Sequence, residues 1–550
     1  MKPTFRLILS ILIFLGAAAG SYWWATNLMD SVYNYRSPLR DNPPPPGQPL
    51  GNPLSQRVIF VLIDGLRLDT SLQPQVMPYL ADLRSQGAWA VMHSMPPSYS
   101  QVGYATLLIG AWPDINDAPP INLDYPDIYT FTQDDLVSAV QRAGLRSAVS
   151  AYNWFEKLIP RDAVSAAHYT SGEDHQADLQ VLDAAFPWID SRAYHFVLIH
   201  IDQIDYAGHY EGGPVDPRWD QAASRADELL RQIVSRLDLT QDTVLVASDH
   251  GHIDRGGHGG HDAVTLIEPF LLVGAGVIPG VYNDVYMVDV APTLAALLGS
   301  NLPASSQGRV LTEMLTLHPE QENRIREAEV LQQEALLEAY LTAIDQHASV
   351  EPQGDSVAAY QAALESVRSE RLNSERLLRA FLAVGLVVLL TAILYLKPPP
   401  NLIWMVIGAL IFIALFNLRY LVLGNWTYSL SSVPSADDLI LFTATSALIA
   451  LLVTWLVISI KLRTFLHSPL QAALTTTHLI YVTIFLLLLP VLWSFTLNGA
   501  TITWTLPDFS SMFIAFISLM QILVVSAVGI LLIALSALIS RVLLLFQARN

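Results

Sequence analysis

The 550-residue sequence contains no cysteine and little charge. The absence of cysteine excludes disulfide bonds, thiolate metal sites and a cysteine nucleophile. Charged residues make up 14% of the chain, against roughly 25% in a typical soluble protein, and hydrophobic residues make up 52%. This composition argues against a fully soluble enzyme and against a disordered protein.

The shortage of charge is concentrated in the C-terminal third of the chain. Residues 380–550 hold six Lys and Arg and three Asp and Glu, so residues 1–379 hold the remaining 24 basic and 46 acidic side chains. The first part is therefore strongly acidic and the second is apolar. The excess of negative charge in the first part argues against nucleic-acid binding through phosphates.

Several apolar stretches are long enough to span a membrane, which takes about 20 residues. Five lie near the C-terminus and one near the N-terminus: residues 380–396, 402–423, 439–460, 479–497, 509–540 and 7–25. We expect an all-α transmembrane bundle of about five helices, preceded by an N-terminal anchor. Residues 7–25 could instead be a cleaved signal peptide, and the long stretch 509–540 could cross once or twice.

The distribution of Lys and Arg predicts the orientation of this bundle. The short loops at 424–438 and 498–508 contain three aspartates and no basic residue, whereas Lys461 and Arg463 lie in the intervening loop. We therefore expect an integral membrane protein with a cytoplasmic N-terminus. Residues 30–375 would then lie outside the cytoplasm, at the cell surface or in a lumen, and membrane lipids would be partners.

We predict five segments along the chain. They are an N-terminal anchor at 1–28, a proline-rich linker at 29–55, an extracytoplasmic α/β domain at 56–315, a helical stalk at 316–375 and the membrane bundle at 376–550. In the α/β domain, buried β-branched runs such as Arg57–Ile63 alternate with helical patterns. This alternation predicts a mainly parallel sheet flanked by helices, with ligands bound beyond the carboxyl ends of the strands.

Acidic and histidine side chains follow three of the expected strands: Asp64 after the first, Asp205 and His209 after the second, and Asp249 and His250 after the third. Histidines 250, 252, 258 and 261 all fall within twelve residues of a glycine-rich segment. Asp and His together, without Cys, suit a divalent ion such as zinc or manganese. Asp64 alone could equally be a turn residue, and the histidine-rich loop could be simply solvated.

A serine lies at the expected start of a helix in PPSYSQVGYATLLIG. A helix N-terminus presents free N–H groups and a positive dipole end, which would hold an anionic phosphoryl group beside Ser100. Ser98 is the alternative nucleophile. Ser100 could also be only a helix cap.

These segments resemble the motifs of the alkaline phosphatase superfamily. The most similar branch is the type I phosphodiesterase/nucleotide pyrophosphatase group with the related GPI ethanolamine phosphate transferases. The matching segments are Asp64–Asp69, Asp205–His209, Ser248–Gly251, Gly257–Gly259 and, more loosely, Pro97–Tyr104. The resemblance covers about residues 56–315 and implies an alkaline-phosphatase-like α/β fold for that catalytic domain.

The resemblance implies two divalent metal ions, zinc or else manganese. One would be held by Asp205, His209 and His258, with His261 as the alternative to His258; the other would be held by Asp64, Asp249, His250 and Ser100. It implies a phosphodiesterase or phosphoethanolamine-type transferase that works through phospho-Ser100. Its substrate would be a phosphoester, lipid-linked or from the cell envelope.

The sequence departs from the family pattern at Gly103, where the nucleotide pyrophosphatases have an asparagine that holds a phosphate oxygen. This departure leaves substrate preference open. We find no sulfatase motif, which argues against sulfate-ester cleavage. The alternatives are a transporter or flippase whose exported domain is a metal-bound binding module, and an inactive homologue.

Overall fold

The computed structural model describes residues 3–346, 352–354 and 356–547. These residues form two compact units. One comprises residues 33–371 and 503–506, and the other comprises the described parts of 1–32, 372–502 and 507–550. Each unit has its own architecture.

The first unit is built on a nine-stranded sheet in the order β4-β3-β5-β1-β6-β7-β2-β8, with β9 beside β2. The five strands from β4 to β6 run parallel, and β7 runs antiparallel to both of its neighbours. The predicted mainly parallel sheet is therefore confirmed. The strands are β1 Arg57–Ile63, β2 Ala88–His93, β3 Ser147–Tyr152, β4 Ala166–Thr170, β5 Phe196–Ile201, β6 Asp242–Ala247, β7 Ile267–Gly274, β8 Gly280–Val281 and β9 Val285–Tyr286.

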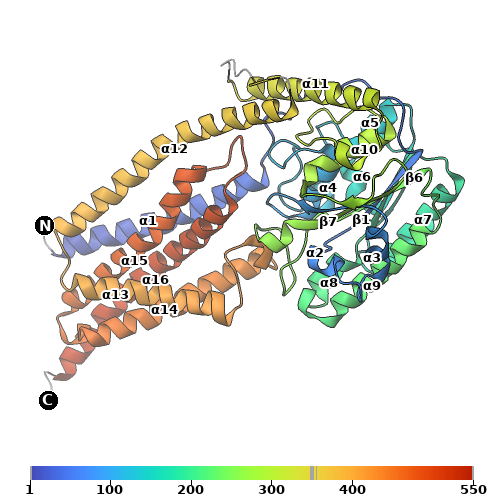
Figure 1. Ribbon diagram of the computed structural model, residues 1–550. Coiled ribbons are helices and arrows are strands. Elements are labelled where there is room, and N and C mark those ends of the chain that lie inside the picture. The colour runs from blue at the N-terminus through green and yellow to red at the C-terminus, as the bar shows by residue number, and fades with distance from the viewer. Residues whose placement is uncertain (1–2, 347–351, 355, 548–550) are drawn as a thin grey trace. The chain divides into compact units, whose positions relative to one another are not determined.

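Helices cover both faces of this sheet, as Figure 1 shows. One face is packed by α3, α7, α8 and α9, and α4, α5, α6 and α10 lie over the other. Side chains from alternate positions of β1, such as Ile59 and Val61, are fully buried in the first of these layers. The helices are α2 Leu68–Ser71, α3 Pro78–Arg84, α4 Ser100–Ile109, α5 Leu136–Arg142, α6 Trp154–Leu158, α7 His175–Ser191, α8 Gln203–Tyr210, α9 Pro217–Val234, α10 Val290–Leu298 and α11 Pro319–Ala343.

Strand register aligns the carboxyl ends of the three central strands. Ile63 of β1 pairs with Ile201 of β5, and Leu62 pairs with Ala247 of β6. The chain therefore leaves these three strands at neighbouring points of one sheet edge. Polar residues that follow the strands are brought together at this edge.

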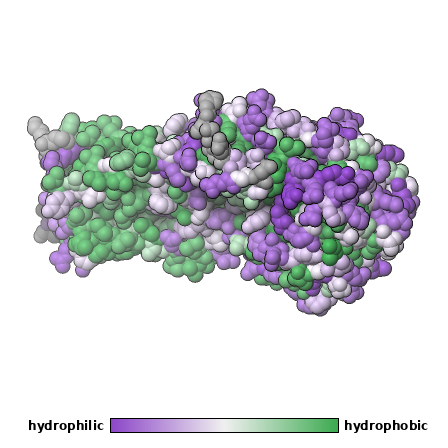
Figure 2. Space-filling view, turned by 45° about the horizontal axis from the view of Figure 1, so that its top comes forward, coloured by the Kyte–Doolittle hydropathy of each residue, from purple (hydrophilic) through white to green (hydrophobic). Residues whose placement is uncertain are grey.

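The second unit is helical, and the described chain has six helices long and apolar enough to cross a membrane. They are α1 Pro3–Tyr33, α12 Val357–Leu396, α13 Leu402–Asn417 together with its helical continuation to Leu423, α14 Ala436–Lys461, α15 Pro469–Asn498 and α16 Phe509–Gln547. Apolar residues gather over the outside of these helices, whereas polar residues dominate the surface of the α/β unit (Figure 2). An apolar exterior is what a helix bundle needs in a lipid environment.

Two helices are longer than the apolar stretches expected from the sequence. The second stalk helix and the first C-terminal membrane helix are one continuous helix, α12, because no proline interrupts Val357–Leu396. The long final stretch is also one uninterrupted helix, α16, of 39 residues. The predicted segment boundaries, including the linker and the stalk, stay predictions.

Candidate metal centre

Three acidic residues meet at the carboxyl ends of β5, β1 and β6, which lie side by side. Asp64 directly follows β1, Asp205 lies in α8 just after β5, and Asp249 lies two residues beyond β6. All three come from segments far apart in the sequence. Parallel pairing of the central strands is what places them at one edge of the sheet.

Asp64, Asp249 and His250 form a group that could hold a metal ion. His250 Nε2 lies 3.4 Å from Asp64 Oδ1 and 3.4 Å from Asp249 Oδ2. Both oxygens are buried and have no hydrogen-bond partner among the described residues. Such oxygens are costly to bury unless a cation pairs with them. These three side chains therefore fit a divalent ion.

The charge balance of this group also favours a cation. Burial, together with the nearby Asp64 and Asp205, raises the pKa of Asp249 well above its usual value. Burial lowers the pKa of His250 to about 3, so its ring is neutral and offers a lone pair. A bound dication would compensate the crowded carboxylates, which the neutral imidazole cannot do.

Ser100 lies against this group. It is the first residue of α4, and Tyr99 occupies the capping position, so Ser100 is not the helix cap. Ser100 Oγ is 3.1 Å from His250 Nε2, while His250 Nδ1 lies 3.2 Å from the Gly251 carbonyl oxygen. A carbonyl oxygen only accepts, so Nδ1 carries the proton and the Ser100 hydroxyl donates to Nε2.

Ser98, the alternative nucleophile, has a different set of contacts. Its hydroxyl accepts the backbone N–H of Gly259 and lies 3.0 Å from Thr265 Oγ1. Its carbonyl oxygen accepts a hydrogen bond from His258 Nδ1 at 2.8 Å. Ser98 therefore supports the loop that carries His258.

A second group of side chains surrounds Asp205. This group comprises Asp205, His250, His252 and His258, whose possible ligand atoms lie within 4.8 Å of one another. His209 lies one helical turn after Asp205, with Nε2 3.4 Å from Asp205 Oδ2 and 2.9 Å from His258 Nε2. Burial raises the pKa of Asp205, but His209, His258 and the hydrogen bond from His252 together hold it well below its usual value. Asp205 is therefore an anionic centre among imidazoles.

The structure thus brings all the predicted site residues into one cluster: Asp64, Ser100, Asp205, His209, Asp249, His250 and His258. His261 is absent from the metal-competent groups found among the described residues. Asp205 and His209 both lie in α8, with Gly208 inside the helix.

Sequence reasoning missed several buried partners of the acids. The Tyr104 hydroxyl donates to Asp64 Oδ2, and His200 Nε2 lies 2.9 Å from the same oxygen. His200 belongs to β5, so a histidine in a fully buried strand run was an available signal. These contacts leave Asp64 Oδ1 directed toward His250 and fix the carboxylate orientation.

Gly103 explains the departure from the nucleotide pyrophosphatase pattern. A Cβ atom at this position would lie 2.6 Å from Asp249 Cβ and 2.8 Å from the Asp249 carbonyl oxygen. Helix α4 therefore packs directly on the segment that follows β6. No side chain fits at residue 103, so this position cannot supply a contact to a phosphate oxygen.

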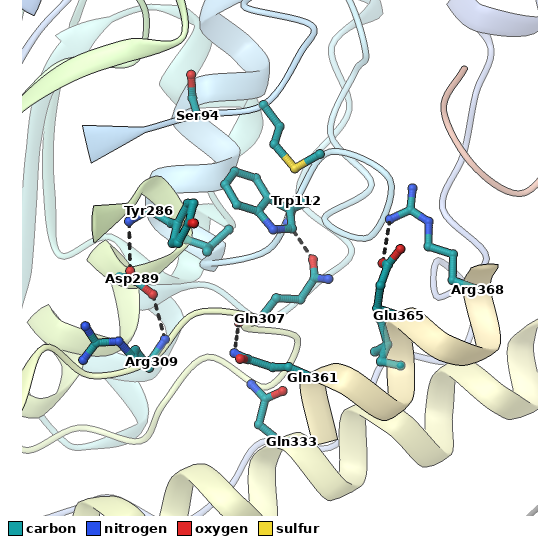
Figure 3. A pocket seen from close by; sticks show the side chains of 13 residues that line it. Ser94, Trp112, Tyr286, Asp289, Gln307, Arg309, Gln333, Gln361, Glu365 and Arg368 are labelled. Atoms are coloured by element: carbon teal, nitrogen blue, oxygen red, sulfur yellow. Dashed lines mark hydrogen bonds and ion pairs between the residues drawn. The ribbon is translucent and has the colours of Figure 1, made fainter. Parts of the chain in front are cut away.

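A separate cavity of about 430 Å³ is lined by residues that include Trp112, Tyr286 and Gln307 (Figure 3). Trp112 and Tyr286 pack edge to face on its wall, with ring centres 6.3 Å apart. Its arginines are already paired, Arg368 with Asp114 at 2.9 Å and Arg309 with Glu313 at 2.6 Å. None of the predicted site residues lines this cavity.

A known family model matches part of the α/β unit. Residues 120–299 match the model of the family described as Type I phosphodiesterase / nucleotide pyrophosphatase. This part of the chain is therefore similar to the type I phosphodiesterase domain. The match includes Asp205 and His258, whereas Asp64 and Ser100 precede it. The resemblance inferred from the short motifs is confirmed.

Curated relatives of the chain include GPI ethanolamine phosphate transferases. The mouse GPI ethanolamine phosphate transferase 3 catalytic subunit is 27% identical over 290 residues, which cover 47% of this chain and 26% of the relative. The human GPI ethanolamine phosphate transferase 2 catalytic subunit is 27% identical over 289 residues, covering 49% and 29%. The chain thus spans about a quarter of the length of such relatives.

Solved structures with a detectable likeness include the murine and human ectonucleotide pyrophosphatase / phosphodiesterase 5. The murine protein has a TM-score of 0.40 and 15% identity, covering 48% of this chain and all of that chain. The human protein has a TM-score of 0.38 and 14% identity, covering 44% and 95%. The transferase relatives and the six apolar helices indicate that this protein is an integral membrane protein.

Proposed function

We propose that the chain is a metal-dependent phosphoester transferase or hydrolase in which Ser100 attacks phosphorus. The observation that carries this proposal is the position of Ser100 Oγ at the start of α4, 3.1 Å from His250 Nε2. The N-terminus of α4 offers N–H groups and a positive dipole end to an anionic phosphoryl group. The type I phosphodiesterase match supports the same chemistry.

One divalent ion is assigned to Asp64, Asp249, His250 and Ser100, and a second to Asp205, His209 and His258. The two unpartnered carboxylate oxygens beside His250 support the first assignment. Carboxylate and imidazole ligands suit zinc, with manganese as the alternative. When bound, the ions would lower the pKa of the attacking hydroxyl and stabilise the leaving oxygen.

The reaction has two steps. In the first, Ser100 Oγ bonds to phosphorus, the bond from phosphorus to the leaving alcohol breaks, and the hydroxyl proton ends on that alcohol. In the second, water or another alcohol attacks the phosphorus of phospho-Ser100 and frees the serine. Hydrolase and transferase therefore share the first step and differ only in the acceptor.

The substrate is a lipid-linked or cell-envelope phosphoester, reached on the side of the membrane opposite the cytoplasm. Six apolar helices support this choice, because a tethered site meets bilayer lipids at high effective concentration. The relatives named GPI ethanolamine phosphate transferases favour transfer of a phosphoethanolamine-type group over simple hydrolysis.

Substitution of Ser100→Ala in the full chain, purified in detergent, tests the nucleophile. Turnover of bis-p-nitrophenyl phosphate should fall at least about 1,000-fold, because loss of a nucleophile removes the covalent route. Bound zinc, measured by elemental analysis, should remain. Ser85→Ala, at an exposed serine, is the matched control and should keep full turnover.

Two results would contradict the proposal. The first is a Ser100→Ala protein that retains wild-type turnover. The second is a metal-loaded wild-type protein that turns over neither bis-p-nitrophenyl phosphate nor p-nitrophenyl phosphate, which would favour a binding or transport module.

A further inference from the structure

The atom that faces Nδ1 distinguishes the buried histidines of the metal centre. His250 Nδ1 lies 3.2 Å from the Gly251 carbonyl oxygen, and His258 Nδ1 lies 2.8 Å from the Ser98 carbonyl oxygen. A carbonyl oxygen only accepts, so both Nδ1 atoms are protonated. A neutral ring then has its lone pair on Nε2, which is the atom directed at the carboxylates. Both rings are therefore prepared to act as ligands.

His252 has the opposite arrangement. The backbone N–H of Gly257 donates to His252 Nδ1 at 2.9 Å. An N–H group only donates, so Nδ1 carries the lone pair and the ring proton is on Nε2. His252 Nε2 lies 2.7 Å from Asp205 Oδ1, a hydrogen-bond distance. This nitrogen donates a proton and has no lone pair for a metal.

We propose that His252 is a positioning residue that holds Asp205 by donating a hydrogen bond, and that it is not a metal ligand. The inference rests on the proposed role of Asp205 as a ligand. The bond occupies one lone pair of Oδ1 and leaves Oδ2 facing His209, 3.4 Å away. Such partners of ligand side chains fix orientation and raise metal affinity.

The surrounding residues fix the His252 ring in this role. The ring is fully buried and packs against Trp219, with ring centres 5.4 Å apart. A Cβ atom at Gly208 would overlap the ring, and one at Gly65 would lie 2.9 Å from Nε2. Both motif glycines, one after Asp64 and one before His209, therefore make room for this side chain.

Two substitutions separate hydrogen-bond donation from ligation and from packing. Gln in His252→Gln can still donate an N–H to Asp205, whereas Met in His252→Met has similar bulk and no donor. Zinc affinity of the full chain in detergent is measured by chelator competition. We expect His252→Met to bind one ion about 10- to 100-fold more weakly, and His252→Gln to stay within a few-fold of wild type.

A cobalt-loaded form gives a readout that is independent of activity. Its visible absorption reports the ligand set, so saturated wild type and His252→Gln should have the same spectrum. A changed spectrum in His252→Gln would mean that an imidazole ligand was lost and would overturn the inference. Wild-type zinc affinity in His252→Met would overturn it as well. Failure of the wild-type chain to bind two ions would instead reject the proposed function.

Discussion

His258 and His261 are three residues apart in one glycine-rich loop, and motif spacing alone left both as candidate ligands. His258 Nε2 lies 3.5 Å from Asp205 Oδ1, and its Nδ1 is oriented by the Ser98 carbonyl oxygen. The described metal-competent groups include His258 and do not include His261. The two histidines should therefore respond differently to the same substitution.

We predict that His258→Gln loses one of the two proposed ions and that His261→Gln keeps both. The reason is that only His258 completes the group around Asp205. Metal content per chain, measured by elemental analysis after gel filtration, checks this. Loss of metal in His261→Gln with full retention in His258→Gln would reverse the assignment.

At the scale of residues, the sequence indicates the proposed metal ligands better than it indicates the hydrogen-bond partners of those ligands. Asp64, Asp249 and His250 could be predicted because acids and histidines directly follow buried strands. The role of His252 could not, because it depends on a proton position set by the Gly257 N–H, which only the folded loop brings to the ring.

At the scale of elements, the approach of α4 to the end of β6 depends on Gly103. Replacing this glycine with alanine would place a methyl group 2.6 Å from Asp249 Cβ. Overpacking of this kind costs about 1–3 kcal/mol and would displace Asp249 or Ser100. The contact therefore couples stability to the geometry of the metal centre.

Gly103→Ala should lower both the thermal unfolding midpoint and the zinc affinity of the full chain. Gly47→Ala is the control, since a Cβ at Gly47 meets no atom within 4 Å. Calorimetry and chelator competition measure the two effects. A Gly103→Ala protein with wild-type values for both would show that α4 does not pack on Asp249 as described.

The elements differ in how well the sequence predicts them. The runs at β1, β5 and β6 are recognisable in the sequence because most of their residues are β-branched or large. In the structure every residue of these strands is buried. Strand β3, with the sequence SAVSAY, has no such run and is set by pairing with distant β5. Gly208 lies inside helix α8, and the His252 ring occupies the space that a Cβ at this position would need.

For the whole molecule, the charge pattern predicts the orientation of the membrane helices. The chain contains no cysteine, so single cysteines can be introduced without removing native ones. Thr501 and His467 are exposed residues in loops at opposite ends of α15. The charge pattern predicts that residue 501 lies outside the cytoplasm and that residue 467 lies inside.

In intact cells, a membrane-impermeant maleimide should label Thr501→Cys directly. It should label His467→Cys only after permeabilisation, because the bilayer blocks its access. The inverse labelling pattern would place the α/β domain in the cytoplasm and would remove the basis for an extracytoplasmic substrate.

The central claim is that distant segments converge to hold two cations beside a serine hydroxyl. Anomalous diffraction at the zinc edge from crystals of the zinc-loaded full chain tests it most directly. The account predicts two peaks, one among Asp64, Asp249 and His250 next to Ser100 Oγ, and one among Asp205, His209 and His258, at about 2.0–2.2 Å from their ligand atoms. A zinc-saturated protein with no peak between these side chains would contradict it.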